Sequence, residues 1–211
     1  MADAWLEPAL EYLCDWLAYQ MRVSEQPGVA IAVALDGEVV LDLALGSASL
    51  AAGEPLTPRH RFRVASHSKS FTAAGVLRLR EEGRLKLDDR AGEYVDSLHP
   101  AVATATIAQL LSHAAGLARD GPDCAYWVDR AAFLDESALR RELADPPAIA
   151  ASERLKYSNH GFGLVGSVIE RVTGEPYAGW IAREVVERAG LAETTPDGPP
   201  PVGAPFARPR L

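Results

Sequence analysis

The pair of residues with the clearest potential for chemistry is Ser66 and Lys69, at the start of a run with helical apolar spacing. Residues three apart on a helix share a face, with Cβ atoms about 5–6 Å apart. At the start of a helix, backbone N–H groups lack intrahelical partners and the dipole favours a developing oxyanion. A lysine buried on that face could take the serine proton. The spacing therefore predicts Ser66 as a nucleophile and Lys69 as its base.

Lysine usage supports this interpretation. The chain has 18 arginines and three lysines, Lys69, Lys86 and Lys156. A guanidinium stays protonated, so only lysine could serve where a proton must be removed. The alternative is a serine that caps a helix beside a surface lysine, because Ser-x-x-Lys matches are common by chance.

A second candidate is Tyr157-Ser158-Asn159, expected in a loop before a helix that starts near Gly161. A phenol beside an ammonium is suited to act as a general base and then as an acid to a leaving group. The Asn159 amide offers both a donor and an acceptor to a substrate. The alternative is a tyrosine packed on the core and an asparagine that caps the helix, and for this motif alone it is preferred.

The elements expected around these motifs form two groups. A helix over 4–23 precedes two apolar, β-branched runs, 29–35 and 39–45, and the Asp36-Gly37 pair between them predicts a hairpin. After Gly53 the pattern is mainly helical, with Gly116 and Gly174 at expected C-caps. The expected helices span 66–82, 106–115, 137–143, 161–173 and 176–188, with a long loop at 118–135.

These elements predict an α+β fold with an incomplete antiparallel sheet, because two strands do not make a stable sheet alone. Residues 1–55 are expected to form the mixed part, and 56–194 a mainly helical part that carries both motifs. Residues 195–211 are rich in proline and glycine and are expected to be a linker or tail.

Composition narrows the class of protein. The 211 residues are 48% hydrophobic and carry a net charge of -8, which argues against nucleic acid and anionic membrane partners. No apolar run reaches the roughly 20 residues of a membrane span, and the N-terminus does not read as a secretory signal, so we expect a cytoplasmic protein. Cys14, on a helix face, and Cys124, in the long loop, make neither a disulfide framework nor a metal cluster.

Taken together, the two motifs resemble the serine β-lactamase and D-alanyl-D-alanine peptidase superfamily, on the class C-like branch, which also holds esterases and D-amino-acid-specific peptidases. Residues 106–117, TIAQLLSHAAGL, are similar to the family's LLSHxSGL helix end. Residues 156–166, KYSNHGFGLVG, are similar to its YSNxGYxLLG segment, and residues 85–89, LKLDD, match a stretch after the catalytic helix. The likeness spans roughly residues 27–195.

The resemblance implies that Ser66 forms an acyl-enzyme, that Lys69 and Tyr157 share the proton transfers, and that Asn159 holds the acyl-side amide. It implies no metal and no cofactor, and a small ester, amide or peptide substrate. β-Lactams, D-amino-acid peptides and simple esters all fit these motifs. A Ser-His-Asp site is disfavoured because no Gly-x-Ser-x-Gly is present, so His67, His113 and His160 are interpreted as structural.

The sequence departs from the family in one respect. The family's third element, Lys-Thr-Gly or His-x-Gly on a late strand, is not found, and Val172-Thr173-Gly174 lacks the cation and reads as a helix end. Three explanations stay open. The chain is a truncated enzyme, it needs a second chain or a missing C-terminal segment, or it is a catalytically impaired relative that works as a binding module.

Overall fold

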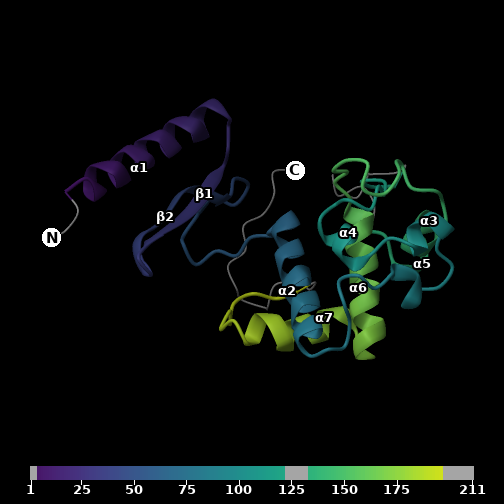
Figure 1. Cartoon of the computed structure of the whole chain (residues 1–211). Coiled ribbons are helices and arrows are strands. Elements are labelled where there is room, and N and C mark those ends of the chain that lie inside the picture. The colour runs from purple at the N-terminus through teal and green to yellow at the C-terminus, as the bar shows by residue number, and fades with distance from the viewer. Residues whose placement is uncertain (1–3, 122–132, 197–211) are drawn as a thin grey trace. The chain divides into compact units, whose positions relative to one another are not determined.

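The computed structural model describes residues 4–121 and 133–196 and divides the chain into two compact units, with the boundary between Arg63 and Val64. Figure 1 shows the elements of both. The predicted loop position of Cys124 and nearly all of the predicted tail fall outside the described residues. None of the described helices is long and apolar enough to cross a membrane.

The first unit is a helix and a small antiparallel sheet. Helix α1 spans Leu6–Val23, and strands β1 (Gly28–Leu35) and β2 (Glu38–Ser49) pair as the predicted hairpin. At its turn Asp36 and Gly37 both have positive φ, 50° and 87°, which is the two-residue geometry that matches strand twist. The expectation of only two strands is wrong, because β3 (Glu54–Pro55) pairs with β2. Because β3 has only two residues, its sequence is too short to show the alternation of apolar and polar residues from which a strand is predicted.

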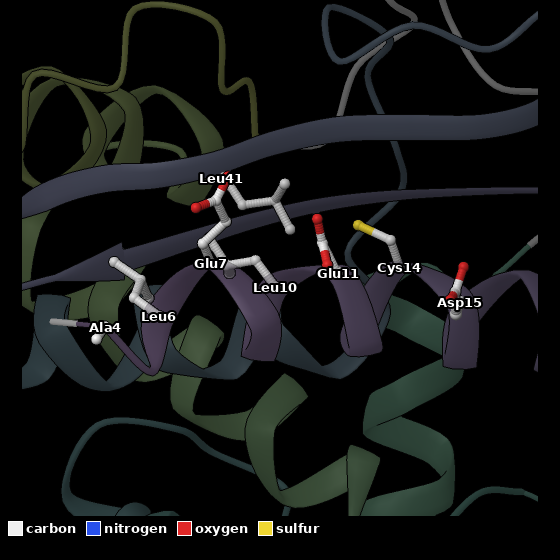
Figure 2. A pocket seen from close by; sticks show the side chains of 8 residues that line it. All are labelled: Ala4, Leu6, Glu7, Leu10, Glu11, Cys14, Asp15 and Leu41. Atoms are coloured by element: carbon white, nitrogen blue, oxygen red, sulfur yellow. The ribbon is translucent and has the colours of Figure 1, made fainter.

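The first unit also contains an open groove between α1 and β2. Figure 2 shows Leu6, Leu10 and Cys14 of the helix directed towards the strand that carries Leu41. The groove measures about 730 Å³, and acidic side chains of α1 also line it. Cys14 is half-buried, and α1 contributes no fully buried side chain. None of the predicted catalytic residues lies here.

The second unit is helical and holds the main hydrophobic core. Helix α2 (Ser68–Glu81), α6 (Asn159–Thr173) and α7 (Tyr177–Ile181) pack together; α2 and α6 run side by side in Figure 1, and α7 lies near their lower ends. Gly75 permits the close approach, because a Cβ there would lie 2.8 Å from the Ile181 Cδ1 atom. The largest fully buried side chains of this core are Leu79, Ile107, Leu110, Leu164, Ile169, Ile181, Val76, Val102, Val165 and Val168.

Short elements complete this unit. The 3₁₀ turns η1 (Ala65–His67) and η2 (Ala91–Glu93) precede α2 and α3 (Pro100–Ala103), and α4 (Ile107–Leu111) and α5 (Glu136–Leu143) follow. After α7 the chain continues as a π-helix, η4 (Ala182–Glu187), where a single helix over 176–188 was expected.

Two helix boundaries in this unit differ clearly from the prediction. The helix expected over 106–115 ends at Leu111, because His113 adopts a left-handed φ of 57°. Gly116 therefore does not cap it, although Gly174, with φ 74°, does cap α6. The run expected as one helix from residue 66 begins as the 3₁₀ turn and becomes α-helical only at Ser68.

Candidate active site

Ser66 lies in the η1 turn, directly before α2, and its side chain is exposed. The preceding residue, Ala65, has a φ of 44°, a conformation that costs a non-glycine residue about 1–2 kcal/mol. Such strain is concentrated at functional sites, where the surrounding structure maintains it. The turn thus presents the Ser66 hydroxyl to solvent instead of packing it along the helix.

Lys69 projects towards Ser66 from the first turn of α2, as the spacing predicted. Its Nζ donates to Ser66 Oγ at 3.3 Å and to Asn159 Oδ1 at 2.6 Å. The Lys69 side chain is half-buried, whereas the sequence analysis predicted a buried lysine. The Lys69 ammonium therefore links the serine to the second motif.

Tyr157 reaches the same serine from 91 residues further along the chain. Its Oη lies 2.6 Å from Ser66 Oγ, with either atom able to donate. Burial alone raises the pKa of the Tyr157 phenol, but interactions with Lys69 and Ser66 and the charge of Arg119 outweigh it. The pKa of Tyr157 consequently lies below its ordinary value of 10.0, which favours the phenolate at this position.

Asn159 is the first residue of α6 and is not part of the loop before it. Ser158 is the N-cap: its Oγ accepts from the Gly161 N–H at 2.8 Å and donates to Ala118 O at 2.6 Å. The helix therefore starts two residues earlier than predicted. This cap fixes the direction of the Asn159 side chain, which meets Lys69.

His113 packs against Tyr157, with ring centroids 4.4 Å apart. Its Nδ1 accepts from the Ser158 N–H at 3.1 Å, and its carbonyl accepts from the Lys156 N–H at 2.8 Å. Burial and the charge of Lys69 lower the pKa of His113, which keeps Nδ1 available as an acceptor. His113 thus holds the chain on both sides of Tyr157.

The other two histidines interpreted as structural are His67, which follows Ser66 in η1, and His160, and neither is hydrogen-bonded to the serine hydroxyl in the described part of the chain. His160 is buried, and burial lowers its pKa although the charges of Glu142 and Asp120 oppose this. Within the described residues, the Ser66 hydroxyl is hydrogen-bonded to Tyr157 and Lys69 and to no histidine.

Two site residues were missed by sequence reasoning, Arg119 and Asp120. The Arg119 guanidinium lies 5.7 Å from the centroid of the Tyr157 ring, and Asp120 Oδ1 accepts from Asn159 Nδ2 at 2.7 Å. Both lie in a segment expected as a loop, where no periodic pattern marks a residue that faces the site. Their only signal was their position just after the segment 106–117.

The arrangement brings all four predicted residues together within the second unit: Ser66, Lys69, Tyr157 and Asn159. A hydroxyl has a phenol oxygen at hydrogen-bond distance and an ammonium slightly further away. This is the geometry required for a nucleophile activated by an adjacent base.

Comparison with known proteins identifies the family to which the chain is similar. The Beta-lactamase family model matches residues 16–209. The chain is 32% identical over 189 residues to esterase EstB of Burkholderia gladioli and 25% identical over 183 residues to protein flp of Staphylococcus aureus strain MW2. These matches cover 82% and 85% of this chain.

Solved structures of related proteins have the same fold as this chain. A penicillin-binding protein homologue from Pyrococcus abyssi, described as octameric, superposes with a TM-score of 0.77 at 30% identity and covers 87% of this chain. A class C beta-lactamase superposes with a TM-score of 0.78 over 93% of this chain at 24% identity, which shows the fold alone. These likenesses confirm the predicted α+β, β-lactamase and DD-peptidase-like fold.

The chain spans only part of these relatives: 48% of the length of EstB, 36% of flp, 43% of the Pyrococcus abyssi protein and 54% of the class C enzyme. Within that shared part, the family model extends over most of the chain and over both motifs. The resemblance inferred from the Ser66 and Tyr157 motifs is therefore confirmed, and this chain belongs to the Beta-lactamase family.

Proposed function

We propose that this chain carries the acyl-transfer site of a serine hydrolase that cleaves an ester or amide through a Ser66 acyl-enzyme. The observation that carries the proposal is the 2.6 Å contact between Ser66 Oγ and Tyr157 Oη, with Lys69 Nζ 3.3 Å from the same Oγ. A phenol with a lowered pKa, next to an exposed hydroxyl, is suited to general-base catalysis.

In the acylation step, the Tyr157 phenolate takes the Ser66 proton while Oγ forms a bond to the carbonyl carbon of the substrate. The tetrahedral intermediate then collapses, the bond to the leaving group breaks, and Tyr157 returns the proton to the leaving atom. The Lys69 ammonium stabilises the phenolate before the transfer and the developing alkoxide during it.

In the deacylation step, water attacks the acyl carbon and loses its proton to Tyr157. The bond to Ser66 Oγ breaks, Tyr157 gives the proton that it took from water to Oγ, and the carboxylic acid product leaves. Throughout, Asn159 keeps one lone pair on Oδ1 and one hydrogen on Nδ2 beyond its bonds to Lys69 and Asp120. The proposed contact with the acyl-side amide of the substrate would use this remaining hydrogen-bond acceptor and donor.

The relatives suggest an order for substrate tests. Esterase EstB, at 32% identity, makes short esters the first substrates to test. The match to the Beta-lactamase family model and the resemblance of the two motifs to D-alanyl-D-alanine peptidases add β-lactams and D-amino-acid peptides. A chromogenic ester, a chromogenic cephalosporin and a D-alanyl anilide would separate the three classes.

The direct test is intact mass after incubation with a fluorophosphonate probe. We expect one adduct on the wild-type chain and none on Ser66→Ala. Ser70→Ala, which removes an exposed serine of α2, is the matched control and should label like wild type. A folded wild-type chain that forms no adduct would contradict activity in this chain, and an adduct that persists in Ser66→Ala would contradict the assignment of the nucleophile.

A further inference from the structure

The side-chain amide of Asn159 can meet Lys69 in two orientations, and only one of them is productive. With Oδ1 towards Lys69, the amide accepts from the ammonium at the observed 2.6 Å. Rotated by 180°, Nδ2 would face Nζ and two donors would oppose each other. The ammonium by itself already disfavours the flipped orientation, and an acceptor at the opposite end of the amide would strengthen this selection.

Asp120 supplies an acceptor at that opposite end of the amide. Its Oδ1 accepts from Asn159 Nδ2 at 2.7 Å, and an ionised carboxylate has only acceptor oxygens. A flipped amide would place its own oxygen against the carboxylate. The contact is also protected from water, since the Asp120 side chain is 9% exposed.

The segment that carries Asp120 holds Asn159 at a second point. The Arg119 carbonyl accepts from the Asn159 backbone N–H at 2.8 Å. The Arg119 side chain approaches Asp120 Oδ2 at 3.3 Å, but it is 68% exposed, so this ion pair contributes little. The 119–120 segment thus fixes both the main chain and the amide of Asn159.

We propose that Asp120 is a positioning residue of the site: its carboxylate locks the Asn159 amide so that Oδ1 holds the Lys69 ammonium against Ser66. The proposal rests on the proposed function for its effect on rate, but not for its effect on the amide. The chain of contacts runs from Asp120 through Asn159 and Lys69 to Ser66.

The test compares variants of the full chain by the rate of fluorophosphonate labelling. Asp120→Ala removes the acceptor and should lower the rate about 10- to 100-fold, the effect of a charge-assisted hydrogen bond. Asp120→Asn keeps an acceptor oxygen and should stay within about fivefold of wild type. Asp120→Leu, similar in size but without an acceptor, replaces the alanine variant if that one fails to fold. Asp145→Ala, at an exposed aspartate, is the control.

A double-variant cycle shows whether Asp120 acts through Asn159. In an Asn159→Ala background, Asp120→Ala should produce no further loss of rate, because the group it orients is gone. Additive losses, or an Asp120→Ala variant that labels like wild type, would overturn the proposal.

A spectroscopic measurement separates this proposal from the proposed function. The Asn159 side-chain NH₂ signals in a ¹H–¹⁵N NMR spectrum, assigned by their loss in Asn159→Ala, should shift and exchange faster with water in Asp120→Ala. Unchanged signals would refute the lock even if the chain is active. If wild type does not label but the signals change as described, the lock stands and the proposed function fails.

Discussion

Replacing Tyr157 by phenylalanine removes one oxygen from the site and leaves the ring in place. That oxygen lies 2.6 Å from Ser66 Oγ, closer than the 3.3 Å of Lys69 Nζ. The ring should keep its packing on His113, whose centroid is 4.4 Å away. The variant therefore tests whether the phenol oxygen is the base, with little disturbance of the fold.

The expected size of the effect follows from this geometry. A positioned general base contributes about 10²- to 10⁴-fold to rate, or about 2.7–5.5 kcal/mol of barrier. Loss of the hydrogen bond should cost only about 1 kcal/mol of folding stability. Tyr157→Phe should thus lower the labelling rate by at least about 100-fold and shift the unfolding midpoint slightly.

The chain offers a matched control in Tyr177. Its Oη makes a contact of equal length, 2.6 Å, with Thr72 Oγ1, outside the site. The assay is the rate of fluorophosphonate adduct formation by mass spectrometry, beside urea unfolding. Tyr177→Phe should label like wild type. A Tyr157→Phe variant that labels at the wild-type rate would refute the role of the phenol and leave Lys69 as the base.

Three further predictions concern stability, each measured by urea unfolding. The pKa of His113 in the folded chain lies below its ordinary 6.5, so as the pH falls the imidazole of the unfolded chain is protonated before that of the folded chain. Folding stability is therefore lost as the pH falls from about 6.5 through the folded pKa. His113→Asn, which tolerates the positive φ and offers Oδ1 to the Ser158 N–H, should lose less stability than wild type between pH 7 and 5; an equal loss would contradict this. Gly116→Ala should cost at least about 1–2 kcal/mol, because φ is 75° and a Cβ would lie 2.2 Å from Ile149 O; an unchanged midpoint would show that the loop relaxes. Leu164→Ala should cost about 2–5 kcal/mol, since the side chain is fully buried, and a smaller cost would mean that the core collapses around it.

Local features of this protein could be derived from the sequence because neighbouring residues alone produce them. Ser66 and Lys69 are three residues apart, so one helical turn brings them together wherever the rest of the chain lies. The hairpin follows from Asp36-Gly37, whose positive φ angles set the turn without help from other segments. The motif likeness to the family rests on the same contiguous stretches.

Helix boundaries were less predictable because contacts outside each segment decide them. The helix that starts at Ile107 stops at Leu111, and His113 turns back to bind the backbone on both sides of Tyr157. Helix α6 begins at Asn159 because the Ser158 hydroxyl accepts from Gly161 and also donates to Ala118, 40 residues away. Apolar periodicity carries no information about such bonds.

The composition of the site was decided by tertiary structure. The sequence by itself determined that Ser66 has a lysine three residues away and that a tyrosine and an asparagine lie two residues apart near a helix start. Only packing of α6 against α2 places Tyr157 against Ser66 across 91 residues, and only the 119–120 segment brings Asp120 to Asn159 across 39. Bonds between neighbours are set by backbone geometry, whereas these pairings depend on how the whole hydrophobic core is buried.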